Sequence, residues 1–171
     1  WHRRFLKALQ SGHKPKRWLL KDPSHLGNLD EILSIYPDAC FIHIHRDPAE
    51  TIPSICSLTS QVRKGFTDSV DPNELGKRTL DFWENSKKRN EAQKKNLNSD
   101  QYMDINYEDF IKNPLQTIED IYANFTFSFD KNNKELLESY IEKSVKTHKE
   151  KHIYTLEEYG LDKKEVHNRL K

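Results

Sequence analysis

The stretch ACFIHIHRDPAETIPS, residues 39–54, constrains the fold of this chain more than any other. Residues 39–45 combine apolar, aromatic and β-branched side chains, which predicts a β-strand. Asp47 and Pro48 follow, with Glu50 close behind; an Asp cap, a Pro at the first helical position and a Glu at the third predict a helix start. A strand that turns at once into a helix is typical of an α/β fold.

The same capping pattern marks further helices. Asp71-Pro72-Asn73-Glu74 and Asn113-Pro114-Leu115-Gln116 repeat it, and they predict helices over residues 73–97 and 115–129. Apolar spacing predicts another helix over residues 134–145. Thr155-Leu156-Glu157-Glu158 predicts a short helix that Gly160 ends.

Two weaker strands complete the expected sheet. RWLL, residues 17–20, and QYMDI, residues 101–105, are strand candidates, and leucines at helical spacing predict a helix over residues 25–35. Strand, helix and strand in about 30 residues form a βαβ unit, which implies a parallel sheet with right-handed crossovers. We therefore expect residues 1–171 to form a single α/β domain. Because Trp1 rather than Met opens the chain, we expect this domain to be incomplete.

The composition excludes some classes of function. The net charge is +1 with both signs interspersed, which argues against a dedicated nucleic-acid-binding protein. No apolar run approaches the roughly 18–20 residues of a membrane span. Cys40 and Cys56 have no zinc-type spacing, and we expect both to pack as small hydrophobic residues; a disulfide between them is the alternative.

A basic side chain follows the strongest strand. Ligands of open α/β sheets lie beyond the carboxyl ends of the strands, where Arg46 is placed, and a helix N-terminus favours anions. Ser54 lies eight positions on, roughly 10 Å along a helix that Pro53 is expected to kink or restart. A phosphate held between Arg46 and Ser54 is one interpretation. An ion pair between Arg46 and a nearby carboxylate is the other.

Lys21 and His25 follow the strand candidate at residues 17–20 and are expected to face the same crevice. A lysine there can stabilise charge on a transferring group, and a histidine can act as a general base. A hydrogen-bonded, purely structural histidine is the alternative.

Four stretches, taken in order, resemble the sulfotransferases that use 3′-phosphoadenosine 5′-phosphosulfate (PAPS), chiefly their bacterial and protist branch. The stretches are KRWLLKDPSHLGNLDEI, YPDACFIHIHRDPAETIPSICSL, NYEDFIKNPLQTIEDIY and HKEKHIYTLEEYGLD. The resemblance implies a three-layer α/β/α fold similar to that of P-loop nucleotide hydrolases. It also implies transfer of a sulfuryl group from PAPS to a hydroxyl or amine acceptor, without a metal.

The resemblance also assigns roles to residues. It places the 3′-phosphate of PAPS on Arg46 and Ser54, the adenine near Tyr107, and the general base at His25 with assistance from Lys21. In the family a late basic loop closes over the 3′-phosphate. The residues in that region here are Lys149, Lys151 and His152.

One family feature is missing. The family binds the 5′-phosphosulfate with a glycine-containing loop after its first strand, whereas Gly12 is the sole glycine before Lys21 here. We therefore expect the chain to be the C-terminal part of a longer sulfotransferase, inactive alone. A non-catalytic nucleotide-binding or interaction domain is the alternative. A nucleotide kinase fits less well, because Walker-type and magnesium-binding residues are absent as well.

Partners and location follow from the resemblance alone. The acceptor is expected to be a small molecule, glycan or peptide, and the location cytoplasmic, with the secretory pathway as the alternative. Two histidine pairs, His43 with His45 and His148 with His152, have spacings that can chelate a metal. No acidic or cysteine residue stands at a useful spacing from the first pair, so we expect no metal there.

Overall fold

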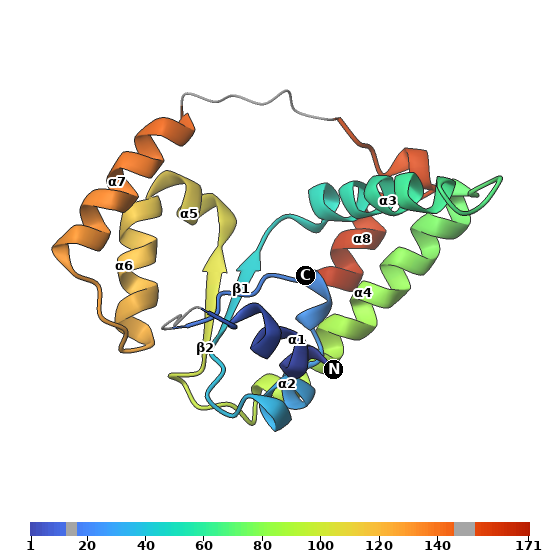
Figure 1. Ribbon diagram of the computed structural model, residues 1–171. Helices are drawn as coiled ribbons and strands as arrows, with labels where there is room; N and C mark the ends of the chain where they lie inside the picture. Colours follow the sequence, from blue (N-terminus) through green and yellow to red (C-terminus); the bar gives the residue numbers. More distant parts are fainter. Residues whose placement is uncertain (13–16, 146–152) are drawn as a thin grey trace.

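The structure, a computed structural model, describes residues 1–12, 17–145 and 153–171. At its centre lie two parallel strands, β1 (Phe41–His45) and β2 (Tyr102–Asn106), paired in register from Phe41 opposite Tyr102 to His45 opposite Asn106. Figure 1 shows α5, α6 and α7 on one side of these strands and α3, α4 and α8 on the other. The predicted α/β class and the parallel arrangement are confirmed.

Helices account for most of the remaining described chain. They are α1 (His2–Leu9), α2 (Leu29–Ile35), α3 (Pro48–Lys64), α4 (Pro72–Lys94), α5 (Tyr107–Lys112), α6 (Pro114–Asn124), α7 (Lys131–Val145) and α8 (Lys163–Leu170), with short 3-10 helices η1 (Pro23–His25) and η2 (Glu157–Tyr159). Two predicted caps are confirmed: Asp47 accepts from the Ala49 N–H, and Asp71 accepts from the N–H groups of Asn73 and Glu74. Asn113 precedes α6 but makes no side-chain cap bond.

The strand predicted at residues 17–20 is wrong. The segment has no helical or strand pairing in the structure, and Leu19 is 88% exposed. An extended segment becomes a strand only when a neighbour completes its hydrogen-bond ladder. Within the described residues, β1 and β2 pair only with each other.

The helix predicted over residues 25–35 is divided in two. Gly27 separates η1 from α2 and adopts a φ of +79°, which glycine tolerates best. It also lies so close to α4 that a Cβ at this position would come within 2.7 Å of the Ser86 carbonyl oxygen. The packing of this turn against α4 therefore interrupts the single helix that the leucine spacing predicted. The short helix predicted before Gly160 is the 3-10 helix η2.

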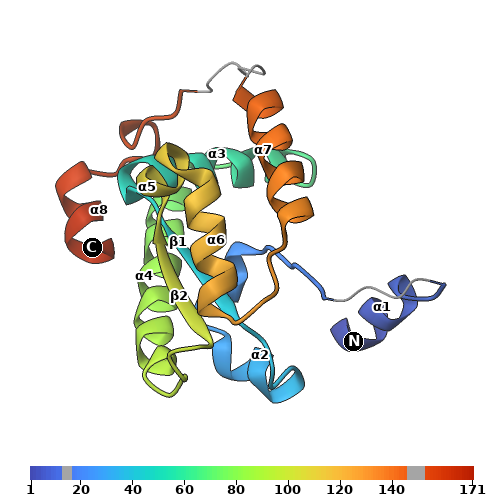
Figure 2. The same ribbon diagram turned by 90° about the vertical axis from the view of Figure 1, so that its left-hand side faces the viewer.

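The main core joins α3 and α4 to the end of the chain. Its buried members are Ile52, Cys56, Leu75, Leu80, Leu156, Tyr159, Leu161 and Val166. At Gly76 of α4, a Cβ would lie 2.1 Å from the Tyr159 carbonyl oxygen, so this position has no room for a side chain. Figure 2 shows α8 beside α3 and α4.

The two cysteines differ. Cys56 is fully buried in the core, as predicted, whereas Cys40 is exposed immediately before β1 and both thiols are free. The prediction that Cys40 packs as a hydrophobic residue is wrong, because the residue lies outside the strand pair, with its Sγ near the Asp38 carbonyl oxygen. None of the helices in the described part of the chain is long and apolar enough to span a membrane.

Candidate phosphate site at the strand ends

The site is built where the two parallel strands end. Arg46 follows β1 directly, and Tyr107 opens α5 directly after β2. Because His45 lies opposite Asn106 in the ladder, Arg46 and Tyr107 leave the sheet side by side. The guanidinium carbon of Arg46 lies 4.7 Å from the centre of the Tyr107 ring, a cation–π distance. The strand register therefore brings together two residues that are far apart in sequence.

Arg46 is held by an acidic neighbour in the structure. Its Nη2 and Nε donate to the Glu50 Oε2 at 2.9 and 3.1 Å. This is the ion pair that the sequence offered as the alternative to a phosphate. Both side chains are substantially exposed, at 40% for Arg46 and 56% for Glu50, so the pair is weak and easily exchanged for another anion.

Asp47 connects the site to the end of the chain. Its carboxylate caps the Ala49 N–H at 2.9 Å and also accepts a hydrogen bond from His167 Nε2 of α8 at 2.7 Å. The bond from His167 holds the pKa of Asp47 below its ordinary value. The turn after β1 is thus fixed from within α3 and from a helix 120 residues later.

Ser54 lies one helical turn beyond Glu50 on the exposed side of α3, whereas Ile52 and Cys56 are buried. Of the two expectations at Pro53, a kink or a restart, the restart is wrong: α3 continues from Pro48 to Lys64 with the buried Pro53 inside it. The Ser54 hydroxyl makes no hydrogen bond to the described residues and can accept a ligand.

Lys21 and His25, the two predicted catalytic residues, are not bonded to the described residues of the candidate phosphate site. Lys21 is exposed, and His25 is half-buried at the end of η1. Asp22 caps η1 by accepting from the Ser24 N–H at 2.8 Å, and the Ser24 hydroxyl followed by this N–H lowers the Asp22 pKa. Neither Lys21 nor His25 shares a hydrogen bond or ion pair with the phosphate-site residues that the structure describes. The remaining predicted residues, Lys149, Lys151 and His152, lie outside the described residues.

Sequence reasoning left the acidic partner of Arg46 unnamed and missed His167. Glu50 stands four residues after Arg46, a spacing at which opposite charges on a helix pair, so this contact had a local signal. His167 had none, because its contact with Asp47 depends on how α8 packs against α3.

Parallel strands that end in a basic side chain, an aromatic ring and a helix N-terminus are typical of an α/β protein, and they make this edge of the sheet a candidate anion site. Residues 1–131 match the Sulfotransferase family, and the chain belongs to this family.

Two solved structures have similar folds. Sulfotransferase STF1 from Mycobacterium tuberculosis H37Rv matches 99% of this chain with a TM-score of 0.80 and 30% identity. Sulfotransferase STF9 from Mycobacterium avium matches 96% of it with a TM-score of 0.83 and 23% identity. The chain spans 43% and 42% of the length of these two proteins. Among curated proteins, no sequence matches it.

Proposed function

We propose that this chain forms the 3′-phosphoadenosine-binding part of a sulfotransferase that uses PAPS. The observation that carries the proposal is the placement of Arg46 beside the Tyr107 ring at the ends of β1 and β2. The guanidinium fork suits two phosphate oxygens, and an aromatic ring suits the adenine face. The free Ser54 hydroxyl on the exposed face of α3 would supply a further hydrogen bond to the 3′-phosphate.

The proposed chemistry is in-line transfer. The acceptor oxygen or nitrogen attacks sulfur, the bond from sulfur to the 5′-phosphate oxygen breaks, and 3′-phosphoadenosine 5′-phosphate (PAP) leaves. His25 takes the proton of the acceptor, and Lys21 stabilises charge on the transferring group. Arg46 and Ser54 hold the far end of the donor. A small molecule, glycan or peptide serves as the acceptor.

The rest of the donor requires further groups. Before Lys21 the sequence has only Gly12 and no run similar to the family's loop, which supplies backbone N–H groups to the 5′-phosphosulfate. Turnover is therefore proposed for a longer protein that carries such a loop, and nucleotide binding for the present chain.

The test is a calorimetric titration of the chain with PAP and, separately, with adenosine 5′-phosphate, which lacks the 3′-phosphate. We expect PAP to bind at least about tenfold more tightly, because a charge-assisted hydrogen bond contributes about 1.5–3 kcal/mol. Equal affinities for the two nucleotides would show that the 3′-phosphate is not recognised and would overturn the proposal.

A second prediction concerns the ion pair that a phosphate must replace. Substituting Glu50→Gln removes a negative charge beside Arg46 and weakens the hold on its guanidinium, so we expect PAP to bind roughly 3–10-fold more tightly. Adenosine 5′-phosphate binding should not change. The measurement is the same titration.

The matched control is Glu74→Gln, which breaks an equivalent i, i+4 pair with Arg78 on α4. It should leave PAP affinity unchanged. A weaker affinity in Glu50→Gln would mean that Glu50 orients Arg46 for the ligand rather than competing with it.

A further inference from the structure

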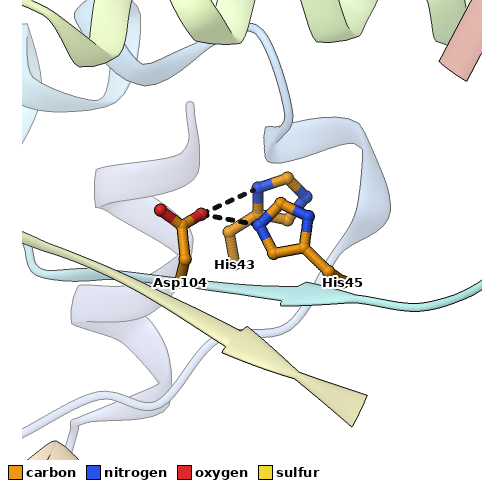
Figure 3. A group of neighbouring side chains, drawn as sticks. All are labelled: His43, His45 and Asp104. Carbon is orange, nitrogen blue, oxygen red and sulfur yellow. Dashed lines mark hydrogen bonds and ion pairs between the residues drawn. The ribbon is translucent and has the colours of Figure 1, made fainter. Parts of the chain in front are cut away.

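Three potential metal ligands converge on one face of the sheet. His43 and His45 are two residues apart on β1, so their side chains project to the same face. The parallel register places Asp104 of β2 directly opposite His43. Figure 3 shows the three side chains pointing toward one another above the strands. This cluster lies next to the candidate phosphate site but shares no residue with it.

The geometry suits one small cation. One ligand atom from each residue lies within 4.8 Å of the other two. His45 Nε2 is 2.6 Å from Asp104 Oδ1, and His43 Nδ1 is 3.6 Å from the same oxygen. An ion with bonds of about 2.0–2.2 Å to nitrogen and oxygen fits such a triangle after small rotations of the side chains.

Neighbouring groups hold the ligands in place. Lys94 of α4 pairs with Asp104 Oδ2, which leaves Oδ1 turned toward the imidazoles. The Tyr102 hydroxyl accepts from Asn90 at 3.0 Å and bonds to His43 Nδ1 at 2.9 Å, so an ion that binds through Nδ1 replaces this hydrogen bond. The contact of Lys94 with Asp104 is of the outer kind that orients ligands in known metal sites. Lys94 also adds a positive charge, which weakens but does not block the binding of a cation.

The site is open to solvent. The side chains of His43, His45 and Asp104 are 26%, 51% and 40% exposed, so an ion can enter and retain a water or another ligand. Two imidazoles and one carboxylate favour zinc or cobalt over magnesium, which prefers oxygen ligands. We propose that His43, His45 and Asp104 bind one divalent transition-metal ion, with zinc as the natural candidate.

The sequence predicted no metal at His43 and His45 because their acidic partner is distant in the chain. Asp104 lies 59 residues from His45 in the chain, and only the pairing of β1 with β2 brings it to the histidines. The inference depends on this register and is independent of the proposed sulfotransferase function. Since Arg46 follows His45 directly, a bound ion would tie together the strand ends from which Arg46 and Tyr107 project.

The test is a titration of the metal-free chain with zinc chloride by calorimetry, and with cobalt chloride by visible absorption. We expect one zinc per chain and the intense bands of four- or five-coordinate cobalt. His45→Ala and Asp104→Asn should each weaken zinc binding at least about tenfold. Because His45 is half exposed, His45→Gln serves as a second variant, and circular dichroism confirms that each is folded.

Two controls make the result decisive. His2→Ala removes a histidine that bonds instead to the Tyr36 hydroxyl, and it should not change zinc affinity. His148→Ala tests the second histidine pair of the sequence. Zinc binding that survives in His45→Ala and Asp104→Asn, or is lost in His148→Ala instead, would overturn the proposal, as would a chain that binds no zinc.

Discussion

Substituting Arg46→Ala is expected to weaken PAP binding by about 100-fold or more. Arg46 offers two parallel N–H donors, now held by Glu50, and charge-assisted bonds of this type contribute about 1.5–3 kcal/mol each. Calorimetric titration of wild type and variant measures the loss. Protein stability should change little, because the pair with Glu50 is exposed.

Two further variants show which property of Arg46 is responsible for the loss of PAP affinity. Arg46→Lys keeps the charge but loses the planar fork, so an intermediate loss of affinity is expected. Arg78→Ala removes an arginine from a comparable i, i+4 pair on α4 and should have no effect. Should Arg46→Ala bind PAP as tightly as wild type, the nucleotide is bound elsewhere or not recognised through its 3′-phosphate.

The second large effect is expected at His25. In a longer chain that carries the 5′-phosphosulfate loop, His25→Ala should lower the turnover of PAPS by about 10²–10⁴-fold, the contribution of general-base catalysis. PAP affinity should be retained, because His25 shares no hydrogen bond or ion pair with Arg46, Ser54 or Tyr107 in the described structure. Initial rates and PAP titrations on the same preparations measure both quantities.

The two readouts separate catalysis from structure. A variant that loses turnover and nucleotide binding together would identify His25 as a structural residue. His2→Ala, a substitution remote from η1, provides the control for both measurements.

Local signals predicted much of the fold because helix starts and strand composition act over a few residues. Asp47-Pro48 and Asp71-Pro72 begin α3 and α4 as expected, and β1 and β2 lie within two residues of their predicted positions. Residues 17–20 show the limit of this reasoning. Their composition favours a strand, but pairing requires a neighbour that composition cannot supply.

The candidate site was predictable to the same extent. Arg46 and Tyr107 each follow a strand that the sequence located, and parallel pairing brings them together. The contacts that tune the site depend on packing. His167 reaches Asp47 only through the docking of α8, and Asp104 meets His45 only through the strand register. No pattern within a short window contains either contact.

The core between α3, α4 and the end of the chain also has a consequence for synthesis. Leu75 and Leu80 emerge from the ribosome long before Leu156 and Val166, which cover them in the finished protein. At a translation rate of roughly 5–20 residues per second, the apolar faces of α3 and α4 stay uncovered for about 10 s. The nascent chain is therefore expected to engage chaperones during this interval, and this core closes only after residues 156–166 have been added.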